Sequence, residues 1–160
     1  MPLIKLETRI NAPIERCFDL ARDVTVHAAA AGETNEHAVA GVTNGMMQLN
    51  DTVTWEATHF GIRQQLTSRI TVFEPPHLFI DEMQRGAFHH WHHQHRFVPQ
   101  EAGTLMLDEV DFASPLGFLG QLVDAVFLKN YMTRFLVKHN EYIKRVAEGG
   151  LSSAEARGHS

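Results

Sequence analysis

The sequence predicts an α+β fold, in which a curved antiparallel sheet of six to seven strands wraps around one long C-terminal helix. Two observations carry most of this prediction. Polar and apolar residues alternate through residues 52–73, as they do in a sheet with one buried face. A run of about 30 residues, 116–147, then contains no helix breaker beyond two early glycines.

The N-terminal part predicts one strand followed by two short helices. Residues 3–10 are short and suited to a strand. In the next segment, "NAPIERCFDLARD", Pro13 fits a first helical turn, and Ile14, Cys17 and Phe18 recur at helical spacing. The segment "VTVHAAAAG" predicts a second short helix, which Gly32 can end.

The middle of the chain predicts a meander of about six strands. Turn residues separate strand-like segments at 35–42, 51–60, 62–73, 77–83, 86–99 and 103–113. In the last of the intervening turns, "PQEAG" is a hairpin signal. The alternation over 62–73 places Ile62, Ile70 and Val72 on one face. Such a sheet needs a cover for its apolar face, and the long helix is the only element large enough.

The long helix has two unlike halves. Ser114 can cap it and Pro115 can start it. The first half is apolar on most sides, and the second half is amphipathic. A curved sheet wrapped on a single helix tends to leave a cavity, and "SPLGFLG" (114–120) and "AAAAGET" (28–34) are placed to close its mouth. The first segment can gate ligand entry or touch a membrane; the alternative is a plain helix start.

The bulk composition excludes several classes of function. The 160 residues suffice for one domain, predicted over residues 1–148, followed by a polar tail, 149–160, that we expect to be disordered. The net charge of −5 and the lack of a basic run argue against nucleic-acid binding. A single cysteine excludes an internal disulfide, and no leader-like or membrane-spanning apolar run occurs, so we expect a cytoplasmic protein.

The stretch "FHHWHHQHRF", residues 88–97, contains five histidines. On a strand it divides into two faces. One carries His89, Trp91, His93, His95 and Phe97, and the other carries Phe88, His90, His92, Gln94, Arg96 and Val98. Because Trp91 and Phe97 are the largest apolar groups, we predict that the first face points inward. His93 and His95 then point into the cavity.

The following strand places a carboxylate near these histidines. One phase of "TLMLDEVDF" buries Met106, Asp108, Val110 and Phe112, and the other buries two acidic residues. A buried unpaired charge is costly, so we predict the first phase, with Asp108 near His95.

Three interpretations of the histidines stay open. A metal ion can bind His93 and His95 together with Asp108, His59 or Asp81, although no third ligand stands at a fixed spacing. Alternatively, a histidine acts as a general base, oriented by Asp108. Finally, the histidines and Asp108 are polar anchors in a binding pocket, or a self-satisfied polar cluster. The last interpretation is favoured, so we predict no metal and no cofactor.

Several longer segments resemble a known superfamily. "WEATHFGIRQQLTSRIT", "FEPPHLFIDEMQRGAF", "WHHQHRF", "GTLMLDEVDFASPLGFLG" and "FLKNYMTRFL" resemble a bacterial subfamily of ligand-binding proteins in the START-like (SRPBCC, birch-pollen-allergen-like) superfamily. The resemblance covers about residues 3–147 and implies the helix-grip fold and a hydrophobic ligand. The superfamily includes lipid carriers, polyketide cyclases and interaction modules, so the fold alone does not decide the function.

We therefore predict a protein that binds a small hydrophobic ligand, such as a lipid, isoprenoid, quinone or aromatic polyketide. The predicted ligand-binding residues are Trp55, Ile70, Trp91, His93, His95, Phe97, Met106, Asp108, Phe112, Leu122, Val126 and Phe127. One alternative is a cyclase or dehydratase that uses His93, His95 and Asp108; another is a non-catalytic interaction module. The sequence leaves a monomer and a homodimer equally open.

Overall fold

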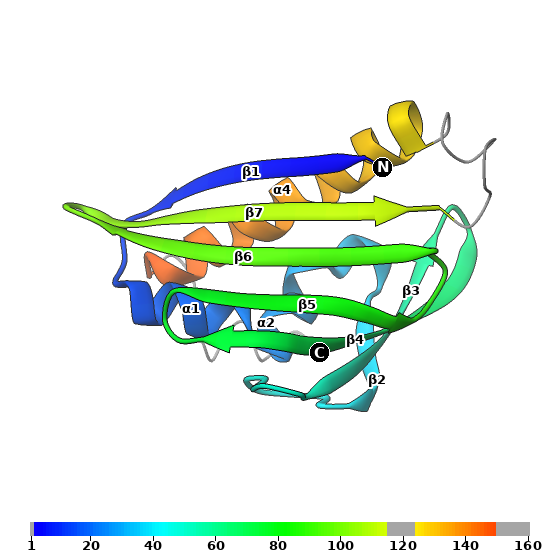
Figure 1. Cartoon of the computed structure of the whole chain (residues 1–160), viewed down its shortest axis with the longest axis horizontal. Coiled ribbons are helices and arrows are strands. Elements are labelled where there is room, and N and C mark those ends of the chain that lie inside the picture. The colour runs from blue at the N-terminus through cyan, green and yellow to red at the C-terminus, as the bar shows by residue number, and fades with distance from the viewer. Residues whose placement is uncertain (1, 115–123, 150–160) are drawn as a thin grey trace.

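The computed structural model describes residues 2–114 and 124–149. Its seven strands form one antiparallel sheet in the order β1-β7-β6-β5-β4-β3-β2 (Figure 1). The strands are β1 (Leu3–Ile10), β2 (His37–Gly41), β3 (Thr52–His59), β4 (Ile62–Glu74), β5 (Leu78–Arg85), β6 (His90–Gln100) and β7 (Gly103–Ala113). The predicted meander of six strands after the helices is confirmed, and β7 returns to pair with β1.

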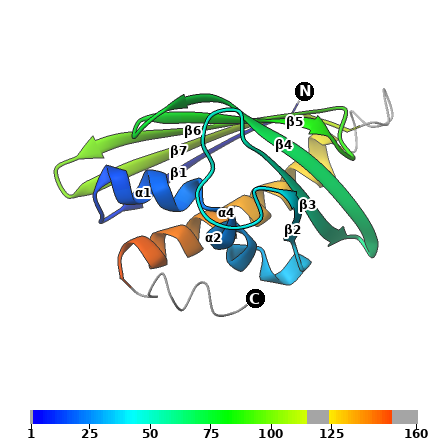
Figure 2. The ribbon, with the colours of Figure 1, turned by 90° about the horizontal axis from the view of Figure 1, so that it is seen from below.

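The helices lie on one face of the curved sheet (Figure 2). They are α1 (Ile14–Ala21), α2 (Val24–Ala30) with the 3-10 turn η1 (Gly32–Thr34), the π-helical turn η2 (Asp124–Leu128) and the long α4 (Lys129–Ala147). The predicted α+β architecture is thus confirmed. The predicted beginning of the long helix, 115–123, and most of the predicted tail, 150–160, lie outside the described residues. No described helix is long and apolar enough to span a bilayer.

Two groups of buried apolar side chains fill the space between the sheet and the helices. The larger group, here the large core, joins α1, α2, the sheet and the end of α4, and includes Phe18, Phe79, Phe97, Met106 and Ile143. The smaller group, the small core, joins β1, β7 and the beginning of α4, and consists of Ile4, Val110, Phe112, Met132 and Leu136. The interior is therefore divided along the length of α4.

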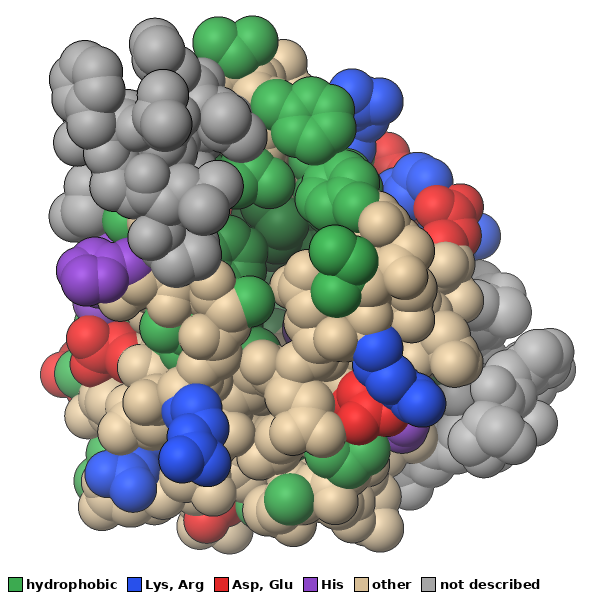
Figure 3. Space-filling view, turned by 90° about the vertical axis from the view of Figure 1, so that its right-hand side faces the viewer, with side chains coloured by type: hydrophobic (Ala, Val, Ile, Leu, Met, Phe, Trp, Pro, Cys, Tyr) green, Lys and Arg blue, Asp and Glu red, His purple; other side chains and the backbone are tan. Residues whose placement is uncertain are grey.

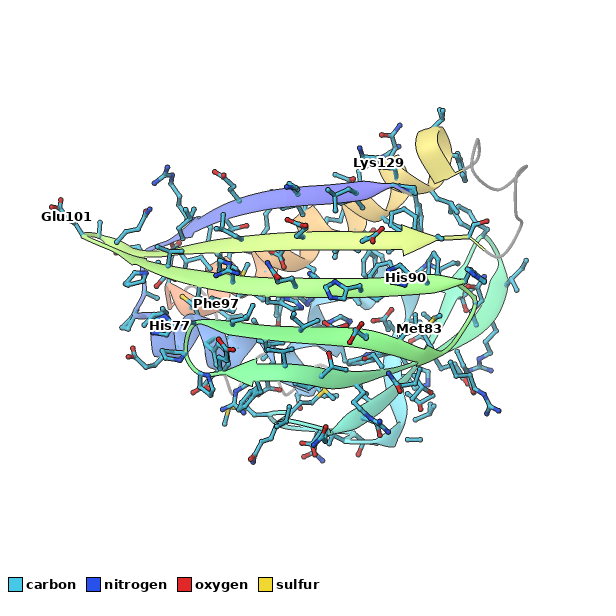
Figure 4. All side chains as sticks on the ribbon, viewed as in Figure 1. His77, Met83, His90, Phe97, Glu101 and Lys129 are labelled. Carbon is cyan, nitrogen blue, oxygen red and sulfur yellow. The ribbon has the colours of Figure 1, made fainter. Side chains whose placement is uncertain are left out.

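The β6–β7 hairpin fixes which side chains face this interior. A two-residue turn at Glu101 pairs Gln100 with Gly103, and this register sets His95 opposite Asp108. Figure 4 shows Glu101 at one end of β6, and His90 at the other end, toward Lys129 of α4. Met106, Asp108, Val110 and Phe112 are all buried. The predicted phase of this strand is confirmed.

Two predicted orientations are wrong because strand alternation stops at irregularities. β6 begins at His90, so His89 is exposed instead of inward, and Phe88 packs on Trp91 with 5.2 Å between ring centroids. In β4, the register shifts between Ile70 and Val72. After this bulge, Phe73 contacts the large core, in place of the predicted Val72.

Candidate functional site

A layer of polar side chains separates the two cores. It consists of Asp81 on β5, His93 and His95 on β6, Asp108 on β7 and Asn140 on α4, and is called the polar layer below. Residues two apart on a strand share a face, so His93 and His95 point to the same side as Trp91 and Phe97. Asp108 likewise lies between Met106 of the large core and Val110 of the small core.

Hydrogen bonds join every member of the polar layer. The Oδ1 atom of Asp108 lies 2.8 Å from His93 Nε2 and 3.1 Å from His95 Nδ1. The other ring nitrogen of His95, Nε2, is 2.9 Å from Asp81 Oδ2. From the helix, the Asn140 side-chain amide donates to Asp108 Oδ2 over 2.7 Å. The layer therefore ties three neighbouring strands to α4.

The protonation states follow from these contacts. Burial opposes the charge of Asp108, but hydrogen bonds from His93 and His95 outweigh it and hold the pKa of this carboxyl below its ordinary value. The pKa of Asp81 is lowered in the same way, chiefly through His95. Burial also opposes a charge on His95, yet its hydrogen bonds to Asp108 and Asp81 raise its pKa to about 9. Burial and the charge of His95 lower the pKa of His93.

Neighbouring rings fix the orientation of the two imidazoles. Phe79 stacks on His95, with 4.1 Å between centroids and 17° between the planes. Trp91 meets His93 edge-on at 6.4 Å. The centroids of His93 and His95 are only 3.7 Å apart. Aromatic packing and the carboxylates together hold both rings in defined positions.

A second set of histidines extends from the polar layer toward α2. The ring of His139, on α4, lies 4.6 Å from that of His27 on α2, and His27 lies 4.3 Å from the ring of Trp55. His27 is paired with Glu36 through Nε2. His139 contacts Asn140 Oδ1 through Nδ1 at 3.4 Å, and its Nε2 is buried without a hydrogen-bond partner among the described residues.

Three members of the polar layer are arranged as candidate metal ligands. Asp81, His93 and His95 each offer one ligand atom, and these three atoms lie within 4.8 Å of one another. Two imidazoles and one carboxylate form a ligand set that suits zinc and iron. Of the three further ligands that the sequence offered, namely Asp108, His59 and Asp81, only Asp81 belongs to this set.

The structure separates the predicted ligand-binding residues into three kinds. Ile70, Phe97, Met106 and Phe112 are packed inside the two cores, each with no more than 2% of its surface exposed. Trp55 and Trp91 are half-buried: Trp55 packs on the large core and on His27, and Trp91 packs on the small core beside His93 of the polar layer. Val126 and Phe127 are largely exposed, and Leu122 lies outside the described residues. That these residues contact a ligand stays a prediction.

Exposed apolar side chains meet where the β3–β4 turn approaches η2. Phe60 packs on Phe127 and Tyr131, with ring centroids 5.4 and 4.6 Å apart. Tyr131 is also hydrogen-bonded to His59 Nδ1 at 2.7 Å. Figure 3 views this end of the molecule and shows hydrophobic side chains gathered around a hollow. His59 therefore belongs to the end of the sheet, and not to the polar layer.

A groove of about 900 Å³ runs between α4 and the segment Ala29–Thr34. Its walls are aromatic near η2, where Phe127, Tyr131 and Phe135 lie. The rest of the α4 wall includes three basic side chains, namely Arg134, Lys138 and Arg145. The segment at 28–34, predicted to lie at a cavity mouth, thus lines a groove.

Sequence reasoning missed part of the site. Asp81 was only one of three possible metal partners, because its strand offered no decisive alternation. Asn140 and His139 were not predicted at all, although a signal existed. Met132, Leu136 and Ile143 mark the buried stripe of α4, and positions 139 and 140 continue that stripe. Two polar residues on an apolar stripe indicate buried partners.

Comparison with known proteins supports the fold. No protein-family model and no curated protein sequence matches the chain. Solved structures do match, among them TTHA0849 from Thermus thermophilus (18% identity, 89% of this chain and 97% of that chain, TM-score 0.69). CV1439 from Chromobacterium violaceum matches at 12% identity over 91% and 96% of the two chains, with a TM-score of 0.70.

A START superfamily protein from Mycobacterium smegmatis matches at 13% identity over 91% of this chain and 97% of that chain, with a TM-score of 0.69. At these identities the comparisons establish architecture. The sheet order, the long helix on its concave side and these matches agree with the fold that the sequence predicted. The chain has the START-like, helix-grip fold.

Proposed function

We propose that this protein binds a small hydrophobic molecule with one polar group, held between the sheet and α4 beside the polar layer. One observation carries the proposal: ionisable side chains interrupt an otherwise apolar interior between the two cores. Ligand pockets are mostly apolar, with a few placed polar groups that fix the orientation of the ligand. The polar layer has this composition.

The environment of His139 suggests which kind of polar group the ligand carries. Asn140 uses its amide nitrogen for Asp108, so its oxygen accepts the proton on His139 Nδ1. Nε2 of His139 then carries a lone pair, and burial lowers the pKa of the ring to about 3, so the ring stays neutral. A buried acceptor without a partner favours a ligand that donates a hydrogen bond. A hydroxylated lipid, isoprenoid, quinol or aromatic polyketide fits this requirement.

Binding can be tested with the two tryptophans, Trp55 and Trp91, as reporters. The polyene fatty acid cis-parinaric acid accepts energy from tryptophan and is itself apolar. We expect saturable quenching at one probe per chain in the single-tryptophan variants Trp55→Phe and Trp91→Phe, because Trp91 lies beside His93 of the polar layer and Trp55 packs on the large core. Quenching that stays linear with probe concentration would rule out a defined internal site.

A second candidate function is an enzyme of the cyclase or dehydratase type. The observation that favours it is the pair of imidazole–carboxylate contacts, His93 with Asp108 and His95 with Asp81. Such pairs orient a histidine for proton transfer. Once a co-purifying ligand is identified by extraction, His93→Gln separates the two functions. If the protein is a carrier, the variant binds the ligand as the wild type does. If it is an enzyme, the variant still binds the ligand but no longer converts it to product.

A further inference from the structure

The register of two neighbouring strands brings two imidazoles and one carboxylate to a common point. Asp81 of β5 lies opposite His93 of β6, and His95 follows two residues later on the same face. All three side chains are mostly buried, His93 and His95 with 8% and 7% of their side-chain surface exposed and Asp81 with 19%. The strands, and not mobile loops, set the positions of the three groups.

Asp108 orients both imidazoles through the ring nitrogens that lie on the side away from the proposed metal ion. Its Oδ1 atom accepts from Nε2 of His93 and from Nδ1 of His95. A metal ion that replaces the Nε2 proton of His95 leaves both rings neutral, and each then places its lone pair on the nitrogen that does not contact Asp108, Nδ1 in His93 and Nε2 in His95. Both of those nitrogens face Asp81 Oδ2, at 3.8 and 2.9 Å. Metal-binding histidines are commonly oriented by a carboxylate on their second nitrogen.

Two of the three spacings between the ligand atoms are close to those around one metal ion, and the third is within 4.8 Å. Bonds of about 2.1 Å in a tetrahedral arrangement separate neighbouring ligand atoms by about 3.4 Å. The distances of 2.9 and 3.8 Å to Asp81 Oδ2 lie on either side of this value. Moreover, Nδ1 of His93 lies 3.8 Å from Asp81 Oδ2, which is beyond hydrogen-bonding distance, although its side chain is more than nine-tenths buried. A metal ion would give this nitrogen a partner.

The charges of the polar layer point to a divalent cation. Asp81 and Asp108 are two carboxylates in one buried layer, and within residues 2–114 and 124–149 their ion-pair partners are the two histidines alone. A divalent ion balances both carboxylates and leaves both imidazoles neutral. Two nitrogen ligands favour zinc or ferrous iron over magnesium and calcium, which prefer oxygen.

We propose that Asp81, His93 and His95 bind one divalent first-row transition-metal ion, with Asp108 and Asn140 as the outer residues that orient the ligands. Three protein ligands leave at least one coordination position open, toward water or the polar group of a bound molecule. The proposal does not depend on the hydrophobic ligand, since the metal alone can be tested.

The test is a calorimetric titration of chelator-treated, dialysed protein with Zn²⁺. We expect one ion per chain with a dissociation constant in the micromolar range or tighter. Asp81→Asn and His93→Ala should weaken binding about 100-fold or more, and Asp108→Asn about 10- to 100-fold. His92→Ala is the matched control, because His92 lies on the opposite face of the same strand, and it should bind as the wild type does.

Two results would overturn the proposal. One is the absence of saturable binding; the other is stoichiometric binding that Asp81→Asn and His93→Ala leave intact, which would assign the metal to exposed histidines. If circular dichroism shows that either variant does not fold, the visible spectrum of the wild type with added Co²⁺ is the test instead. Strong visible absorption of a four- or five-coordinate ion supports the site, and a spectrum like that of aqueous Co²⁺ contradicts it. Parinaric acid binding is measured separately, so the two proposals fail independently.

Discussion

At the scale of single residues, Asp108 is the centre of the polar layer. Its two carboxylate oxygens contact His93, His95 and the amide of Asn140, and 2% of its side chain is exposed. The negative charge strengthens all of these contacts, because imidazole and amide N–H groups donate hydrogen bonds to the carboxylate. Removal of one member of such a buried set leaves the others without compensation.

The variant Asp108→Asn should therefore lower the free energy of unfolding by about 3 kcal/mol or more. The control is Asp111→Asn on the same strand, where the carboxylate lies 3.4 Å from His90 and both side chains are about one-third exposed. This change should cost less than about 1 kcal/mol. Urea unfolding with a chelator present measures both. Equal losses for the two variants would mean that the polar layer contributes nothing specific to stability.

His139 gives the stability a dependence on acid pH. Burial and the charge of His27 lower the pKa of His139 from 6.5 to about 3 in the folded protein. Below pH 6.5, the unfolded chain therefore takes up a proton that the folded chain does not, and stability falls. Between pH 6.5 and 5, this histidine alone should cost about 2 kcal/mol. His93, whose pKa is also lowered, acts in the same direction.

The variant His139→Phe keeps a ring at this position but cannot take up a proton. The difference in unfolding free energy between pH 6.5 and 5 should shrink by about 2 kcal/mol relative to the wild type. His89→Phe, at an exposed position, serves as the control and should leave the difference unchanged. An identical pH dependence in the wild type and His139→Phe would show that this ring is not held neutral.

At the scale of elements, the β6–β7 hairpin determines the register that pairs His95 with Asp108. Gly103, just after the turn, has a φ of +136°. A Cβ atom there would collide with the carbonyl oxygen of Ile10 and lie 2.9 Å from Cα of Asn11. The hairpin can therefore pack against the end of β1 only with glycine at this position.

Gly103→Ala should destabilise the protein by about 3 kcal/mol, because backbone atoms of another strand must move. Gly45→Ala is the control: its φ is also positive, +76°, but nothing lies within 4 Å of the added Cβ. Its cost should be about 1 kcal/mol, from backbone conformation alone. Thermal unfolding compares the two. A smaller loss for Gly103→Ala than for Gly45→Ala would contradict the packing of this hairpin.

The end of α4 is joined to α1 by one side chain. The guanidinium of Arg16 donates to the carbonyls of Val146 and Ala147, both at 2.8 Å, in the last turn of the helix, where carbonyls lack partners within the helix. Arg16→Ala should therefore cost about 2 kcal/mol. Lys138→Ala, on α4, breaks an exposed ion pair with Glu33 and should cost less than about 1 kcal/mol. Urea unfolding of both variants tests this difference.

The elements also show what the sequence could predict. The order of strands and helices was predictable, because each has a clear period or turn signal. The inward phase of β7 was predictable too, because the other phase buries two acidic residues. The bulge in β4 was not, since it depends on how β4 meets β5. The pairing of Asn140 with Asp108 joins two elements that are far apart in the sequence. The spacing of residues within either element therefore does not reveal it.

At the scale of the whole molecule, a polar layer divides the interior into a large and a small core. The sheet curves around α4 (Figure 2). The residues of the layer come from β5, β6 and β7 on one side and from α4 on the other. Burial of these ionisable groups gives little net stability compared with apolar side chains of equal size. Beside the half-buried Trp91, these groups are placed to contact the molecule and the metal ion that we propose.

We propose that a small hydrophobic molecule occupies this interior. Native mass spectrometry of the protein as purified, paired with organic extraction of the same sample, tests it most directly. We expect one apolar molecule per chain, which extraction removes, and protein that afterwards binds parinaric acid in its place. A chain that carries only its own mass, and that shows no saturable probe binding, would mean that no such ligand is bound in the interior.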